Sequence, residues 1–266
     1  MNTATKDADF SLTTTIADQR ASDFQSSLEL DSAPSRPLKT LFVISSLAVG
    51  GAETLLVNTF RNFRKTHVIP SVACLKKKGL LGETIESEFE VTENWLTNRF
   101  DLRVLPKLTQ YIRRQKIDAV ITVGAGDKMF WGRLCARLAS VPVICSAVHS
   151  TGWPDVIGKL NRSLTPITDA YIGVAKSHGK FLMDYERFPA KKVVVIPNGV
   201  DTDRFCPNVQ SKREVREELG LSLRAPLVGI VASLRHEKNH ALFVHAARQV
   251  VDAIPEAQFI IIGEGP

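Results

Sequence analysis

The sequence predicts an α/β protein, in which a doubly wound parallel sheet is followed by the first β-α-β unit of a second, similar domain. From Leu38 onward, short β-branched runs alternate with helical patterns, as in parallel sheets covered on both faces. An apolar run from Thr40 to Leu47 leads through Gly50-Gly51-Ala52-Glu53 into a helical pattern, which is the order strand, glycine turn, helix. The sequence Pro197-Asn198-Gly199 then separates the last strand of the sheet from a new α/β unit.

The elements before this break follow from their own patterns. The expected strands are short apolar or β-branched runs, at Thr40–Ser45, His67–Leu75, Ala119–Val123, Val141–Val148, Ala170–Val174 and Val193–Ile196. The expected helices carry apolar residues at helical spacing, at Glu53–Phe63, Leu102–Gln115, Met129–Ala139 and Ser177–Tyr185. Leu80–Phe89 is also compatible with a helix.

A second unit begins after the break. Beyond a connecting stretch, we expect a polar helix at Lys212–Leu219, a strand at Leu227–Ala232, a helix at Asn239–Val251 and a strand at Gln258–Ile262. A single β-α-β unit buries too little apolar surface to be a stable domain unaided. It therefore either docks on the first domain or belongs to a domain whose remainder is not in the sequence.

These patterns divide the chain into three parts. Residues 1–37 are rich in Ser, Thr, Asp and Ala without sustained periodicity, which predicts a disordered leader. Residues 38–205 form the first domain, and residues 206–266 form a linker and an incomplete second domain.

Composition excludes several classes of protein. No apolar stretch approaches the length of a membrane span, and the N-terminus lacks the pattern of a secretory signal. The four cysteines are scattered, which predicts buried thiols in a reducing, cytoplasmic compartment rather than a zinc site or disulfides: Cys74, Cys135, Cys145 and Cys206. The net charge of +6 is spread along the chain without a nucleic-acid-binding motif, so nucleic acid is not expected as a partner. Its basic residues either form solvated faces or attract phosphorylated or membrane-bound anions.

Two motifs of the first domain fall where strands end. Adjacent glycines at 50 and 51 allow positive φ and close approach of the backbone to a ligand, and the helix that follows directs free N–H groups at it. The alternative is an ordinary tight turn. His149 follows the strand Val141–Val148, at the carboxyl edge where open α/β sheets bind ligands, although it could equally be a polar loop residue.

Two further motifs lie at and beyond the break. Asn198 and Gly199 would form a turn at the domain exit, and the asparagine could cap or contact a ligand. Between strand and helix of the second unit, Arg235 and Lys238 could join helix N–H groups in a phosphate site, or form a solvated basic loop.

Taken in order, Gly-Gly-Ala-Glu at 50–53, His149, Pro-Asn-Gly-Val-Asp at 197–201 and Glu-Lys-Asn-His at 237–240 resemble the GT-B glycosyltransferases of family 4. The resemblance covers residues 38–266. It implies two Rossmann-like domains and a retaining enzyme that moves a sugar from a nucleotide-sugar donor to a glycan or lipid-linked acceptor. It further implies no metal and no other cofactor, and a setting in polysaccharide or cell-envelope synthesis. A cytoplasmic location at the inner face of the membrane, with peripheral membrane contact, would suit the basic residues.

The resemblance also implies roles for individual residues. His149 would contact a donor sugar hydroxyl or position the acceptor, Gly51 would let backbone amides approach the reacting centre, and Lys238 would neutralise the leaving diphosphate. The donor-binding set is Gly50, Gly51, Glu53, Asn198, Gly199, Arg235 and Lys238. Acceptor specificity would lie in loops at 76–100 and 151–164.

The sequence departs from the family pattern in two places. The arginine that commonly stands five positions before the lysine is Ser233 here, and Arg235 lies two residues further on. The family's pair of glutamates is missing: Glu256 and Glu264 have its spacing, but the strand expected between them would hold them apart. Two other hypotheses therefore stay open, a noncatalytic sugar-binding or glycan-binding protein that has lost the donor site, and a GT-B sugar-nucleotide epimerase.

Overall fold

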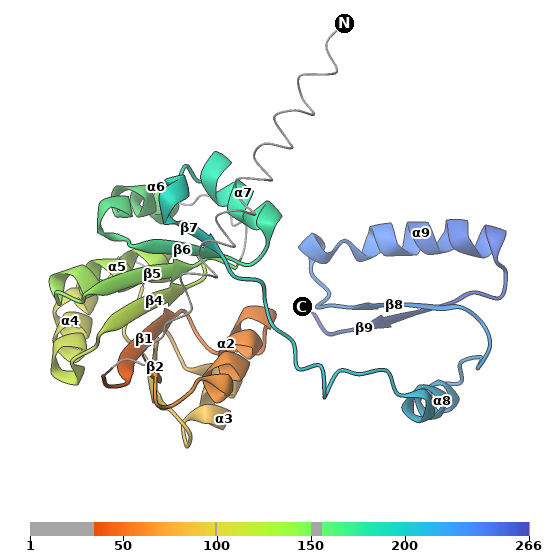
Figure 1. The fold of residues 1–266 in the computed structure, drawn as a ribbon. Helices are drawn as coiled ribbons and strands as arrows, with labels where there is room; N and C mark the ends of the chain where they lie inside the picture. Colours follow the sequence, from red (N-terminus) through yellow and green to blue (C-terminus); the bar gives the residue numbers. More distant parts are fainter. Residues whose placement is uncertain (1–34, 99, 150–155, 266) are drawn as a thin grey trace, which may run out of the picture. The chain divides into compact units, whose positions relative to one another are not determined.

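The computed structural model describes residues 35–98, 100–149 and 156–265 (Figure 1). The chain divides into two compact units, Met1–Gly199 and Val200–Pro266. Most of the predicted leader therefore lies outside the described residues, as do residues 151–155 of the second predicted specificity loop.

The first unit is built on a parallel sheet of seven strands in the order β3-β2-β1-β4-β5-β6-β7. The strands are β1 Leu38–Ile44, β2 Val68–Cys74, β3 Glu90–Thr92, β4 Ala119–Val123, β5 Val143–Ala147, β6 Ala170–Gly173 and β7 Val193–Val195. The chain first adds strands on one side of β1 and then returns to add β4 on the other side. This reversal places a topological switch point between β1 and β4.

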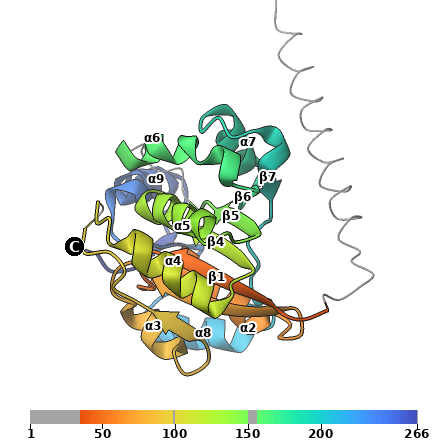
Figure 2. The ribbon, with the colours of Figure 1, turned by 90° about the vertical axis from the view of Figure 1, so that its left-hand side faces the viewer.

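Helices cover both faces of this sheet, as predicted (Figure 2). They are α2 Gly51–Asn62, α3 Gly79–Ile85, α4 Val104–Gln115, α5 Asp127–Leu138, α6 Val156–Ser163 and α7 Lys176–Asp184, with short 3-10 turns at Thr165–Ile167 and Ala190–Lys192. Alternate side chains of β1 separate the two layers: Leu41 and Val43 pack with α4 and α5, whereas Phe42 and Ile44 pack with α2 and α3. The fold class predicted from the strand and helix alternation is confirmed.

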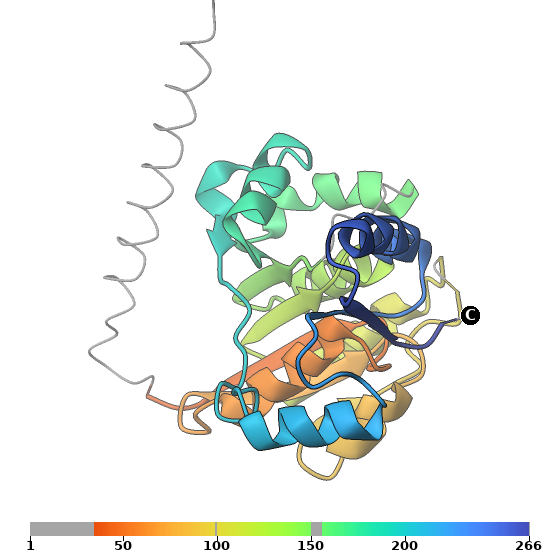
Figure 3. The same cartoon turned by 90° about the vertical axis from the view of Figure 1, so that its right-hand side faces the viewer.

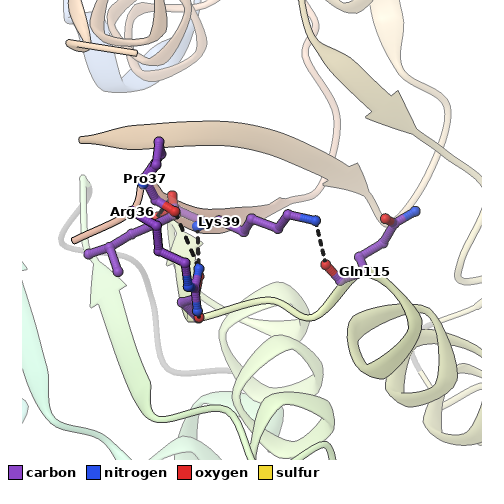
Figure 4. A network of polar contacts seen from close by, with 7 residues as sticks. Arg36, Pro37, Lys39 and Gln115 are labelled. Atoms are coloured by element: carbon purple, nitrogen blue, oxygen red, sulfur yellow. Dashed lines mark hydrogen bonds and ion pairs between the residues drawn. The ribbon is translucent and has the colours of Figure 1, made fainter. Parts of the chain in front are cut away.

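A polar network fixes the start of β1 to the connection before β4 (Figure 4). Both terminal nitrogens of Arg36 donate to the carboxylate of Asp118, at 2.7 and 2.6 Å. The same carboxylate accepts the backbone N–H of Lys39 at 2.9 Å, and Lys39 Nζ donates to the Gln115 carbonyl at 3.2 Å. Arg36, among the last residues of the predicted leader, is thus joined to the first domain by hydrogen bonds to Asp118.

The second unit contains one parallel strand pair, β8 Leu227–Val231 with β9 Gln258–Ile262. Helix α8 Val209–Glu218 precedes it, and the 3-10 turn η3 His236–Lys238 and helix α9 His240–Ala253 connect the strands. Helix α9 lies over one face of the pair (Figure 3), where Phe243 and Phe259 meet edge to face with ring centroids 5.9 Å apart. The predicted β-α-β unit is confirmed.

Four local expectations need correction. Residues 76–100 and 151–164 are not simply loops: α3 and β3 lie in the first range, and α6 in the second. Helix α3 ends at Ile85, because the chain then enters the short edge strand β3. The expected glycine turn at 197–201 is wrong, since the chain turns at residues 202–204, where Asp201 Oδ1 accepts the N–H groups of Asp203 and Arg204.

The predicted burial of the cysteines holds for part of the set. Burial raises the pKa of Cys74 and Cys135 to about 12, so both are inert thiols. Cys145 is half-buried, whereas Cys206 is exposed. The prediction of burial is wrong for Cys206, because this residue lies in the exposed connection after residue 200, outside the sheet.

Candidate functional site

The candidate site lies at the carboxyl edge of the sheet in the first unit, where the loops after β1, β4, β5 and β6 emerge. Parallel strands bring these loops to one edge, and open α/β sheets bind ligands there, beside the switch point. Of the predicted site residues, Gly50 lies in the loop after β1, Gly51 and Glu53 lie in the first turn of α2, and His149 lies in the loop after β5.

The glycine turn after β1 has a different backbone from the one expected. Gly50 is extended, with φ −166°, and Gly51 is the first residue of α2. The turn therefore does not use the positive φ that glycine permits. What glycine supplies is space: a Cβ at Gly50 would lie 2.4 Å from Glu53 Oε2, whereas a Cβ at Gly51 would have no described atom within 4 Å. Gly51 is exposed, so a ligand can approach its backbone closely.

Backbone hydrogen bonds connect this turn to the start of α3. The Leu47 N–H donates to the Lys78 carbonyl at 2.7 Å, and the Leu81 N–H donates to the Leu47 carbonyl at 3.0 Å. Gly79, with φ +74°, allows the contact, because a Cβ there would lie 2.7 Å from the Ala48 nitrogen. The backbone that presents the first N–H groups of α2 is thus held in place.

His149 lies two residues beyond β5 and is half-buried. Burial lowers its pKa, the nearby charge of His178 lowers it further, and the Glu53 carboxylate acts in the opposite direction. The glycine turn and His149 both follow parallel strands of one sheet, so the structure brings to one edge two motifs that are separated by 95 residues in sequence. A neutral imidazole can both donate and accept a hydrogen bond at this edge.

Two features of this edge were missed by the sequence analysis. His178, in the first turns of α7, is 8% exposed and its Nδ1 accepts the Val174 N–H at 3.3 Å. Gly124 and Gly126 form a second glycine turn after β4, with φ +93° and +82°. Only the glycine turn had a signal in the sequence, since Gly124 follows directly on the predicted strand Ala119–Val123, whereas His178 lies on a predicted helix.

A buried arginine holds the second glycine turn to the neighbouring helix. Arg133 of α5 is 0% exposed and donates to the Met129 and Asn161 carbonyls, to Asn161 Oδ1, to Thr168 Oγ1 and to the Tyr171 hydroxyl, at 2.7–2.9 Å. Asn161 Nδ2 donates in turn to the Gly126 carbonyl at 3.1 Å. We call Arg133, Asn161, Thr168 and Tyr171 the Arg133 network.

The remaining predicted residues lie elsewhere. Asn198 and Gly199 are exposed in the segment that follows β7. Arg235 and Lys238 of the second unit are exposed at the two ends of η3, joined by the Lys238 N–H to Arg235 carbonyl bond of 3.0 Å. The next residue, Asn239, caps α9 with its own Oδ1, which accepts the Leu242 N–H at 3.2 Å. Strand β9 separates Glu256 from Glu264, as expected.

The described residues contain neither a candidate metal-binding cluster nor a candidate membrane-spanning helix. No group of three or more His, Cys, Asp or Glu among them could hold a metal ion. None of the helices in the described ranges is both long and apolar enough to cross a bilayer.

Comparison with known proteins gives named glycosyltransferases among the relatives. The chain is 25% identical over 244 residues to the putative glycosyltransferase EpsF of Bacillus subtilis, covering 86% of this chain and 62% of the relative. It is 28% identical over 176 residues to the UDP-Gal:alpha-D-GlcNAc-diphosphoundecaprenol alpha-1,3-galactosyltransferase of Escherichia coli, covering 62% and 45%. The chain thus spans 62% or less of the length of these relatives.

The fold also matches solved structures. Anabaena Alr3699/HepE in complex with UDP superposes with a TM-score of 0.69 at 18% identity, over 86% of this chain and 62% of that chain. The model of glycosyltransferase family 4 matches residues 49–204, which include the glycine turn and His149. The chain therefore belongs to glycosyltransferase family 4.

Proposed function

We propose that this protein is a retaining glycosyltransferase that moves a sugar from a nucleotide-sugar donor to a glycan or lipid-linked acceptor. The observation that carries the proposal is the meeting of Gly51, Glu53 and His149 at one sheet edge, in a chain of family 4. In the reaction, the bond from the anomeric carbon to the diphosphate breaks and a bond to the acceptor hydroxyl oxygen forms. The acceptor proton leaves with the diphosphate or with water.

The residues divide this chemistry between them. The free N–H groups at the start of α2 suit a diphosphate or a sugar oxygen, and the open space at Gly51 lets either approach. His149, as a neutral imidazole, contacts a sugar hydroxyl. In the second unit, the exposed cations Lys238 and Arg235 would suit the leaving diphosphate, where charge develops in the transition state. With these cations available, the reaction requires no metal and no other cofactor.

The acceptor part of the proposal rests on charge and on the relatives. The E. coli relative is named for a sugar acceptor on diphosphoundecaprenol. Exposed lysines at 76 and 77 and exposed Arg114 would suit an anionic acceptor or a membrane surface. Location in the cytoplasm at the inner face of the membrane, and a role in polysaccharide or cell-envelope synthesis, belong to the same proposal.

The test is transfer of labelled sugar by the purified protein from UDP-galactose, UDP-glucose or GDP-mannose to an α-D-GlcNAc diphospholipid. Transfer or donor hydrolysis is expected from a form extended to the length of the relatives, in which Gly51→Ala should lower kcat/KM by tenfold or more. The chain alone, which spans 62% or less of these relatives, should have low activity. The added Cβ meets no described atom, and alanine is the better helix former by up to about 1 kcal/mol, so the fold should not suffer. Asn58→Ala, at an exposed position of α2, is the matched control and should leave the rate unchanged.

Two results would contradict the proposal. If no donor is transferred, hydrolysed or bound by the extended wild-type form, the noncatalytic hypothesis replaces it, and binding of sugars without turnover would point the same way. If Gly51→Ala turns over like the wild type, the glycine turn is not part of the site. Conversion of a donor sugar to its epimer without transfer would favour the epimerase hypothesis.

A further inference from the structure

The side chain of His178 has one nitrogen engaged and one without a partner. Its Nδ1 accepts the backbone N–H of Val174 at 3.3 Å. An accepting nitrogen carries no proton, so the neutral ring has its proton on Nε2. Nε2 is buried and has no hydrogen-bond partner among the residues that the structure describes.

Such an orphaned donor needs an explanation, because buried polar groups in folded proteins are almost always hydrogen-bonded. The Val174 bond fixes the ring and leaves Nε2 on the side of the ring away from that strand end. Burial also lowers the pKa of His178, so the ring stays neutral and Nε2 keeps its proton as a donor near pH 7.

The strand register brings the backbone on which the His178 ring is fixed level with His149. Strands β5 and β6 pair with Ala147 opposite Ile172, and the Val148 N–H donates to the Ile172 carbonyl at 2.9 Å. Two residues beyond that pair, the register brings His149 level with Val174, the residue on which the His178 ring is fixed. The two imidazoles therefore share the edge formed by β5 and β6.

We propose that His178 is a second ligand-binding imidazole of this site, whose Nε2–H donates a hydrogen bond to a sugar hydroxyl oxygen. The assignment of a sugar rests on the proposed function. A hydroxyl fits better than a phosphate, because the donor is uncharged and its surroundings include another neutral imidazole and, further on, the Glu53 carboxylate. The hydroxyl belongs either to the donor sugar or to the acceptor sugar.

Two isosteric variants separate this role from a structural one. In His178→Asn, Oδ1 can still accept the Val174 N–H while the Nε2 donor is lost. In His178→Gln, the amide nitrogen reaches the place of Nε2 while the Nδ1 acceptor is lost. His67→Asn, at the amino edge of the sheet, is the control.

The measurement is affinity by calorimetry on the whole chain, with urea unfolding followed by tryptophan fluorescence. The donor arm compares UDP-galactose, UDP-glucose and GDP-mannose with UDP and GDP, and the acceptor arm uses the α-D-GlcNAc diphospholipid. His178→Asn should keep the unfolding midpoint and lose about tenfold in affinity in one arm, equivalent to about 1.4 kcal/mol. Affinity for UDP and GDP should not change. His178→Gln should keep the affinity and unfold at lower urea.

The proposal is overturned if His178→Asn binds every sugar probe like the wild type, or if no probe shifts the His178 ring nitrogens in spectra of the 15N-histidine-labelled chain. One result would distinguish the proposed role of His178 from the proposed transferase function. Sugar binding that depends on His178, without any transfer, would refute the transferase and leave the role of His178 standing.

Discussion

Replacing Arg133 by methionine should destabilise the first unit by about 1–2 kcal/mol. The guanidinium is 0% exposed, and among the described residues all its acceptors are uncharged. Methionine fills much of the same volume and removes every donor. Thr168 and Tyr171 keep other hydrogen bonds, to Leu164 and Thr165, and the Asn161 carbonyl keeps the Leu164 N–H at 3.3 Å, so the group left without a donor is Asn161 Oδ1.

The magnitude follows from this one acceptor. A buried polar group left unsatisfied costs about 1–3 kcal/mol. Removing the buried charge recovers part of this free energy. Burial lowers the pKa of Arg133, and the same desolvation makes folding with a charged guanidinium less favourable. The net loss is therefore expected in the lower half of that range.

The assay is urea unfolding followed by tryptophan fluorescence, which reports on the first unit because all three tryptophans precede residue 199 in the sequence. Arg137→Met, at an exposed position one turn further along α5, is the matched control and should change the free energy of unfolding by less than about 0.5 kcal/mol. Arg133→Met/Asn161→Leu should lose less than the sum of its single variants, since both partners are then apolar. A loss below about 1 kcal/mol for Arg133→Met, or strict additivity, would refute the reasoning.

Three further changes probe the frame of the site. Gly132→Ala should cost about 1–3 kcal/mol in thermal unfolding, because its Cβ would lie 2.5 Å from Thr122 Cγ2; unchanged stability would show that α5 can shift. Asp118→Asn should lower the free energy of unfolding by about 1 kcal/mol near pH 7, because Arg36 holds the pKa of Asp118 below its ordinary value. The difference from wild type should vanish as pH falls below about 4, since protonation of Asp118 then removes the stabilisation from the wild type. The lowered pKa of His149 should make stability fall as pH drops below about 6.5, where the unfolded ring binds a proton first; in His149→Gln that slope should flatten, and an unchanged slope would assign it to other groups.

The sequence was sufficient for the elements whose patterns are local. Strands β4 and β9 begin and end where the β-branched runs do, and the glycine turn and His149 both fall at the predicted sheet edge. Conformation at single residues was not predictable in the same way. Gly50 and Gly51 suggested positive φ, but the structure uses their missing side chains instead, and the need for that space arises from the position of Glu53 and from access to the backbone.

Contacts between distant segments explain what the sequence could not show. His178 gives no signal by itself on a helical pattern, because its importance depends on Val174 and on the pairing of β5 with β6. Arg133 resembles any other basic residue of an amphipathic helix, yet it is fully buried, and its acceptors come from segments 28 to 38 residues away as well as from its own helix. Burial of a charge is visible only after the chain has folded.

Each of the described groups of the site is held by hydrogen bonds that involve the backbone of the site or of a neighbouring segment. One of these hydrogen bonds connects the site to the Arg133 network. The Gly50 turn is braced by the start of α3, His178 is fixed on Val174, and the turn after β4 is held at Gly126 by Asn161. A site that must hold reacting groups within a fraction of an ångström depends on such supports. Because Asn161 serves both the Arg133 network and the Gly126 carbonyl, loosening the network frees the loop at the switch point. Arg133, at the centre of that network, is therefore expected to support the turn after β4 through Asn161.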